Sequence, residues 1–140
     1  MTQLVAFGQS LGAALKPGAV VWLEGELGAG KTTLVQALAS GLGVAERPIS
    51  PTYNLVHHYE GGGVKQGGGG VYHVDCFRLH SPAEAADLDW ASIGSGDAVL
   101  IEWPERAGPW APEPDLRIRL DHEADPERRR VTLWDGTAPW

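Results

Sequence analysis

One stretch decides the fold: residues 19–32 read AVVWLEGELGAGKT. Residues 19–23 form an uninterrupted apolar run, which is typical of a strand covered on both faces of a sheet. The second half of the stretch, from Gly25 to Thr32, fits the spacing G-x-x-x-x-G-K-[ST] at every position. A helix is predicted to follow over 31–40. A strand, a glycine-rich turn and a helix in this order predict a phosphate-binding loop in an α/β fold.

The loop pattern has a direct physical explanation. Glycines let successive backbone N–H groups turn toward an anion, and a helix that begins at Lys31 adds the positive end of its dipole. The Lys31 ammonium can reach β- and γ-phosphates, and the Thr32 hydroxyl can ligate Mg²⁺. A chance match in a glycine-rich chain is the alternative, but the flanking strand and helix argue against it. The predicted nucleotide contacts are Leu27, Gly28, Ala29, Gly30, Lys31, Thr32 and Thr33.

Two acids are candidates to complete the site. Glu102 ends the apolar run Ala98–Ile101, and open α/β sheets bind ligands at the carboxyl ends of their strands. Asp75 lies in a predicted strand over 71–79, where aspartate is disfavoured, which indicates a role in chemistry or a hydrogen bond. An aspartate that faces water on a half-exposed hairpin is the alternative. The sequence leaves open which acid contacts Mg²⁺ and which orients an attacking water.

Two further segments contain candidates. Thr52 follows Ser50-Pro51 and is predicted to sense a γ-phosphate or its metal; an ordinary turn before a strand is the alternative. Arg128 begins the run Arg128–Arg130, and we include it among the possible nucleotide contacts. A solvated hairpin edge is the simpler interpretation of that run.

The rest of the chain predicts a mixed sheet in a single domain over 1–140. An amphipathic helix is expected over 2–15, and a short one over 81–88, with Ser81 as its capping residue. One hairpin is expected to pair 52–60 with 71–79, and another 115–122 with 128–135. Seven glycines in 61–70 predict a flexible tip for the hairpin of 52–60 and 71–79. The expected class is a three-layer, phosphate-loop α/β fold with central parallel strands flanked by antiparallel hairpins.

Composition narrows the function classes. The 140 residues carry 11 Lys and Arg against 18 Asp and Glu, a formal net charge of −7, which argues against a free-standing nucleic-acid binder. The single cysteine, Cys76, cannot form an internal disulfide and is expected to be a buried hydrophobe. No secretory signal or membrane-length apolar run is visible, so a cytoplasmic location is expected.

The remaining histidines and tryptophans give weaker signals. The five histidines share no metal-ligand spacing and are predicted to be surface or core residues without a chemical role. Trp103 and Trp110 flank a proline-rich loop, where tryptophan is equally typical of a core anchor or an interface.

Taken together, the motifs resemble the TsaE (YjeE) family of small bacterial phosphate-loop ATPases over nearly the whole chain. The resemblance rests on five motifs: GELGAGKTTL at 25–34, SPTY at 50–53, YHVDCFR at 72–78, SPAE at 81–84 and IEWPERA at 101–107. The family's motif has a tyrosine before the arginine, where this chain has Phe77.

The resemblance implies a role in making threonylcarbamoyladenosine at position 37 of tRNA. It implies slow ATP hydrolysis with Mg²⁺, stimulated by the partners TsaB and TsaD, with tRNA contacted only through the complex and no membrane involved. Carried over by position, Lys31 and Thr32 belong to the phosphate loop, and Thr32 and Glu102 to Mg²⁺. Asp75 corresponds to a Walker B-like acid, and Thr52 to a switch-like segment.

Two other function classes stay open from the sequence. A small-molecule kinase could use the same loop, although 140 residues leave little room for an acceptor pocket and a lid. A nucleotide-gated interaction module with negligible catalysis is the other, because an isolated site without an arginine finger should be slow.

Overall fold

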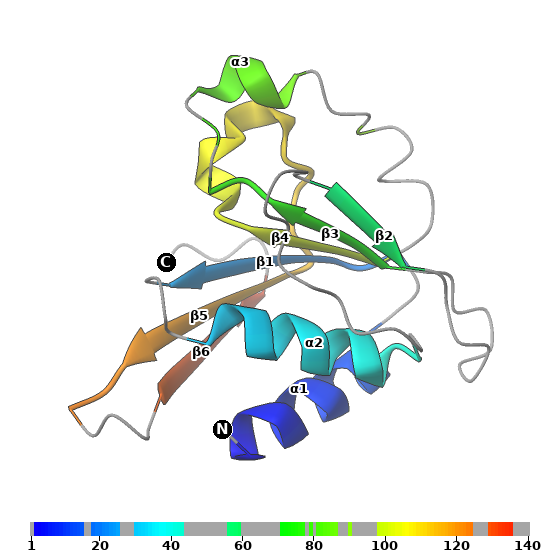
Figure 1. Cartoon of the computed structure of the whole chain (residues 1–140), viewed down its shortest axis with the longest axis vertical. Helices are drawn as coiled ribbons and strands as arrows, with labels where there is room; N and C mark the ends of the chain where they lie inside the picture. Colours follow the sequence, from blue (N-terminus) through cyan, green and yellow to red (C-terminus); the bar gives the residue numbers. More distant parts are fainter. Residues whose placement is uncertain are drawn as a thin grey trace.

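The described part of the computed structural model is one mixed sheet with helices on both faces (Figure 1). It comprises residues 2–15, 18–25, 30–43, 56–59, 71–77, 79, 81–86, 90, 98–124 and 129–135. The strands are β1 (Val20–Gly25), β2 (Val56–Tyr59), β3 (Val71–Asp75), β4 (Ala98–Glu102), β5 (Leu116–His122) and β6 (Arg129–Asp135). The helices are α1 (Thr2–Ala14), α2 (Lys31–Gly41), α3 (Pro82–Ala85) and the 3-10 turns η1 (Pro104–Arg106) and η2 (Gly108–Trp110).

Within these residues the strand order is β2-β3-β4-β1-β5-β6. The four inner strands run parallel, and the edge strands β2 and β6 pair antiparallel with β3 and β5. The predicted class is therefore confirmed: central parallel strands are flanked by antiparallel hairpins. Parallel strands need cover on both faces, and the fully buried β4 meets that requirement.

Helices α1 and α2 lie side by side on one face of the sheet (Figure 1). Their core includes Leu34 and Leu38 from α2, which are fully buried against sheet residues such as Leu23 and Leu100. The other face has a separate core, built with Leu79, Ala85 and Ala107 from shorter elements. The sheet is thus the middle of three layers, and the third layer consists of short helices and turns.

Leu4 and Leu11 of α1 pack in the core, as expected of an amphipathic helix, and glycines lie at the centre of its contact with α2. Gly8 and Gly12 are the buried residues at its centre, and a Cβ at Gly12 would lie 2.2 Å from the carbonyl oxygen of Leu38. Ala14, at the end of α1, is exposed. Glycine allows the two backbones to approach closely, so the small side chains set the distance between these helices.

Two predicted boundaries were wrong. Strand β3 ends at Asp75 instead of continuing to residue 79, because the Asp75 carboxylate accepts the N–H of Phe77 at 3.0 Å and forms a local turn. Helix α3 ends at Ala85, and its Ser81 side chain makes no capping hydrogen bond. The Ser81 backbone carbonyl accepts the N–H of Glu84 instead.

No helix among the described residues combines the length and the apolar character that crossing a bilayer requires. The glycine-rich segment 61–70 lies outside the described residues, and its predicted flexibility stays a prediction.

Candidate phosphate and metal site

The candidate site lies at the carboxyl ends of β1, β3 and β4, beside the N-terminus of α2. The glycines that flank the loop have conformations that other residues rarely adopt: φ is 142° at Gly25 and 104° at Gly30. A Cβ at Gly25 would lie 2.3 Å from the carbonyl oxygen of Leu120 on β5. Two features therefore favour glycine at position 25: its positive φ and its close packing against β5. Gly30 is the N-cap of α2 and has no side chain that could cover the helix N-terminus.

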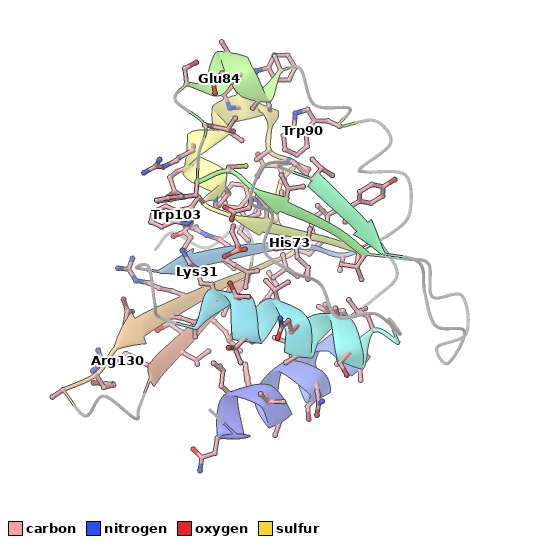
Figure 2. All side chains as sticks on the ribbon, viewed as in Figure 1. Lys31, His73, Glu84, Trp90, Trp103 and Arg130 are labelled. Carbon is pink, nitrogen blue, oxygen red and sulfur yellow. The ribbon has the colours of Figure 1, made fainter. Side chains whose placement is uncertain are left out.

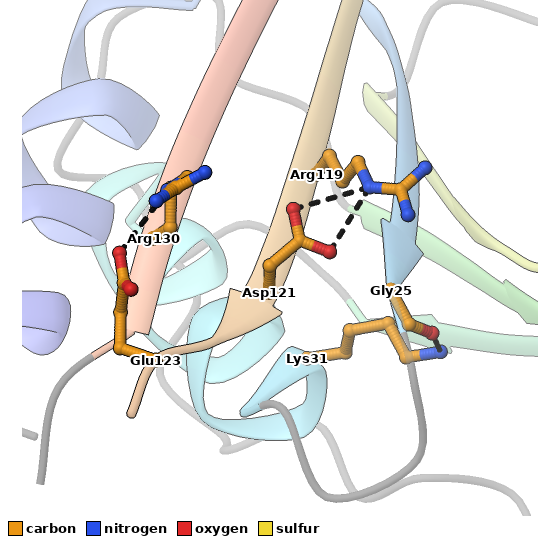
Figure 3. A network of polar contacts seen from close by, with 6 residues as sticks. All are labelled: Gly25, Lys31, Arg119, Asp121, Glu123 and Arg130. Carbon is orange, nitrogen blue, oxygen red and sulfur yellow. Dashed lines mark hydrogen bonds and ion pairs between the residues drawn. The ribbon is translucent and has the colours of Figure 1, made fainter. Parts of the chain in front are cut away.

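Lys31 points back from α2 toward the end of β1 (Figures 2 and 3). Its side chain is buried, and its Nζ donates a hydrogen bond of 2.7 Å to the carbonyl oxygen of Gly25. Burial lowers the pKa of the ammonium, whereas nearby carboxylates oppose this shift. In order of decreasing effect, they are Glu102, Asp75, Glu105 and Glu24.

Trp103 forms one wall of the site. Lys31 Nζ lies 3.8 Å from the centre of the Trp103 ring, a cation–π contact. Trp103 has a left-handed backbone with φ 56°, and its ring lies 5.2 Å from that of Phe77. Arg106 packs near both rings and donates a hydrogen bond to the Phe77 carbonyl oxygen. Trp103 thus acts as a partly buried anchor of the site, while Trp110 is 47% exposed.

Asp75 and Glu102 are brought together by the parallel pairing of β3 and β4, in which they are direct cross-strand partners. Glu102 is buried with 4% of its surface exposed, and Asp75 is half-buried. Burial raises the pKa of Asp75, and the charge of Glu102 raises it further. The sequence predicted both acids as site residues without placing them together, and this register brings them side by side.

His73 is a site residue that the sequence patterns did not reveal. Its side chain is fully buried, and its Nε2 lies 2.6 Å from Oε2 of Glu102. The signal that could have found it is the spacing His73-Val74-Asp75 in YHVDCFR, because alternate residues of a strand lie on the same face. The prediction that none of the five histidines has a chemical role overlooked this spacing.

Glu24 is a second residue that was overlooked. It lies at the end of β1, and its carboxylate is 3.9 Å from a guanidinium nitrogen of the buried Arg117. Burial and the charge of Glu105 raise the pKa of Glu24 to about 7 from its ordinary 4.5, although Arg117 and Arg119 act in the opposite direction. The residue stands directly before the loop and so adds to the negative charge of the site.

The donor set fits Mg²⁺ held together with a polyphosphate. Among the described residues, no three His, Cys, Asp or Glu side chains gather into a metal site of their own. Mg²⁺ in nucleotide sites commonly takes only one or two protein ligands beside substrate phosphates. Glu102 at a strand end and Thr32 in the first turn of α2 are suitable oxygen donors. Several carboxylates act on Lys31, and a divalent cation would offset their negative charge.

Several predicted contacts cannot be placed. Leu27, Gly28, Ala29, Thr52 and Arg128 lie outside the described residues, and their roles stay predictions. Thr33 is partly buried in α2.

On the β5–β6 hairpin, Arg119 pairs with Asp121 and Arg130 with Glu123, each at 3.1 Å (Figure 3). Arg130 therefore fits a solvated hairpin edge better than a phosphate contact. Cys76 is fully buried as expected, and burial raises the pKa of its thiol to about 12.

The sheet order and the loop define a phosphate-loop α/β protein. The family described as "Threonylcarbamoyl adenosine biosynthesis protein TsaE" matches residues 1–131. A Nostoc protein named tRNA threonylcarbamoyladenosine biosynthesis protein TsaE is 37% identical over 124 residues, covering 85% of this chain and 72% of that protein. A Treponema pallidum protein of the same name is 38% identical over 123 residues, covering 87% of each.

A solved structure supports the same assignment. The crystal structure of Bacillus subtilis YdiB superposes with a TM-score of 0.74 and 28% identity, covering 94% of this chain and 78% of that one. The chain belongs to the TsaE family.

Proposed function

We propose that this protein is a Mg²⁺-dependent ATPase subunit required for N6-threonylcarbamoyladenosine modification of tRNA, and that it works with TsaB and TsaD. The observation that carries the proposal is the placement of Lys31: it lies buried at the start of α2, against the glycine-flanked end of β1 and within electrostatic reach of Asp75 and Glu102. Family membership supplies the pathway.

In this proposal each side chain has a defined task. When ATP binds, the Lys31 ammonium gives up its hydrogen bond to the Gly25 carbonyl and contacts the β- and γ-phosphates instead. The first backbone amides of α2 donate hydrogen bonds to the same phosphates. Thr32 and Glu102 hold Mg²⁺, which neutralises charge that develops on the phosphates. Asp75, beside Glu102 at the carboxyl ends of β3 and β4, orients the attacking water.

A slow rate for the isolated chain follows from this assignment. Phosphoryl transfer depends on charge stabilisation, and an arginine finger can be worth about 10³–10⁵ in rate. Among the described residues, Arg106 approaches Lys31 through the shared contact with Trp103, but its guanidinium packs on the aromatic rings. We therefore propose that TsaB and TsaD supply or position such a group. The net charge of −7 fits docking on protein partners better than direct contact with RNA.

Phosphate release from ATP tests the proposal, first for the chain alone and then with TsaB and TsaD added. Lys31→Ala and Glu102→Ala provide the site controls. The proposal expects stimulation by the partners that both variants lose. Equal slow hydrolysis with and without the partners would contradict the assembly role, and hydrolysis that survives Lys31→Ala would contradict the assigned site.

A further inference from the structure

We infer that His73 is a positioning residue for the metal ligand Glu102: it holds one carboxylate oxygen and so leaves the other, Oε1, for the nucleotide-bound Mg²⁺. The inference rests on the proposed function and adds to it a residue for which the sequence alone predicts no chemical role.

The geometry of the sheet creates this pair. His73 stands opposite Leu100 in the β3–β4 register, and Glu102 follows two residues later on β4. The two side chains are diagonal neighbours on one face, at a spacing that long side chains can bridge. The distance of 2.6 Å between Nε2 and Oε2 is that of a strong hydrogen bond with a carboxylate. Figure 2 shows His73 at the centre of the sheet.

Packing alone does not explain an imidazole at this position. His73 is fully buried between positions occupied by apolar residues such as Val71 and Leu100. Among the described residues, its Nδ1 has no hydrogen-bond partner, which is costly for a buried polar atom. An aliphatic side chain would fill the space without that cost. The hydrogen bond to Glu102 is therefore the interaction for which the imidazole is suited.

The contact with Glu102 identifies the donor. A carboxylate accepts hydrogen bonds, so Nε2–H of His73 donates to Oε2 of Glu102. The Glu102 carboxylate is thereby fixed in rotation at the end of its strand. Without this bond it could turn toward solvent or away from Asp75. Partners that orient a metal ligand in this way are typically worth about 10–100-fold in metal affinity or activity.

Two carboxamide variants separate positioning from structure. Gln places its side-chain nitrogen the same number of bonds from Cα as Nε2 of histidine, whereas Asn is one bond shorter. His73→Gln can therefore keep the donor to Glu102, and His73→Asn cannot. Val71→Ala, in the same strand and equally buried, is the control for a stability loss without loss of the donor.

The readout is ATP affinity measured by calorimetry on the full chain, once with Mg²⁺ and once with EDTA. The ratio of the two affinities isolates the contribution of the metal. We expect His73→Asn to lower that ratio about tenfold or more while affinity in EDTA is unchanged, and His73→Gln to stay within about threefold of the parent. Thermal unfolding verifies that each variant is folded, and His73→Leu replaces His73→Asn if the latter is not.

The outcomes distinguish two failures. A ratio in His73→Asn that equals that of the parent would overturn the positioning role alone. An equal fall in His73→Asn, His73→Gln and Val71→Ala would overturn it too, because it would reflect general destabilisation. A parent chain whose ATP affinity does not depend on Mg²⁺ would contradict the proposed function itself, and the role of His73 with it.

Discussion

Asp75 and Glu102 face each other across two parallel strands, as direct partners in the register of β3 and β4. Burial and mutual repulsion make this an unfavourable arrangement for a fold without a cation, because both raise the pKa of Asp75. Such stored repulsion is typical of functional sites. It also leads to predictions about stability that do not depend on activity.

Asp75→Asn should stabilise the metal-free protein at pH 8. A carboxyl whose pKa is raised on folding loses stability as pH rises, since the folded state holds its proton longer than the unfolded state does. Asn removes the charge and can still accept the N–H of Phe77. We expect a gain of about 1 kcal/mol in the free energy of unfolding by urea at pH 8, and no gain at a pH low enough to protonate Asp75. A loss at pH 8 would contradict the repulsion.

Glu24→Gln should flatten the pH dependence of stability between pH 5 and pH 8. The folded pKa of about 7 lies above the ordinary 4.5, so ionisation of Glu24 progressively destabilises the parent across this window. We expect the difference between variant and parent to grow by about 1 kcal/mol from pH 5 to pH 8. Glu105→Gln, which removes a charge that raises this pKa, should give part of the same effect. Parallel curves of stability against pH for the parent and Glu24→Gln would contradict the raised pKa of Glu24.

Gly25→Ala should be strongly destabilising before any nucleotide is considered. The added Cβ meets the Leu120 carbonyl oxygen at 2.3 Å, and φ is 142°. We expect a loss of about 3 kcal/mol in urea unfolding. The matched control is Gly18→Asn, where φ is 78° and asparagine tolerates a left-handed backbone. Similar losses for the two variants would show that close packing against β5 is unimportant.

Glu102→Gln should lower the pKa of Asp75, because it removes the charge that raises it while leaving the burial in place. Carboxyl titration followed by NMR in the metal-free protein measures this directly. Val71→Ala, in the same strand as Asp75, serves as the comparison, since it changes no charged group. An unchanged Asp75 titration in Glu102→Gln would mean that the two acids do not interact.

The sequence predicted the features that local patterns encode. Apolar runs located the buried strands β1 and β4, and the loop spacing located Gly25, Gly30 and the start of α2. It placed the end of β3 wrongly, because the Asp75 side chain competes with the strand for the N–H of Phe77. Helical periodicity of large residues also concealed the glycine contact between α1 and α2.

The site residues that escaped prediction depend on contacts between distant parts of the chain. His73 gains its partner only when β3 pairs with β4, and Trp103, which follows β4, contacts Lys31 at the start of α2. The raised pKa of Glu24 likewise requires burial together with Glu105. Only His73 leaves a local signal, its spacing from Asp75 within one strand; the contacts of Trp103 and Glu24 do not follow from the composition or spacing of one segment.

Calorimetric titration of ATP with Mg²⁺ into the full chain and into Lys31→Met tests the assigned phosphate site most directly. Methionine fills a similar volume without the ammonium, and thermal unfolding verifies that the variant is folded. We predict saturable binding by the parent that weakens at least about 100-fold in Lys31→Met, which corresponds to about 2.7 kcal/mol. Absence of binding by the parent, or equal binding by both proteins, would contradict the assigned phosphate site.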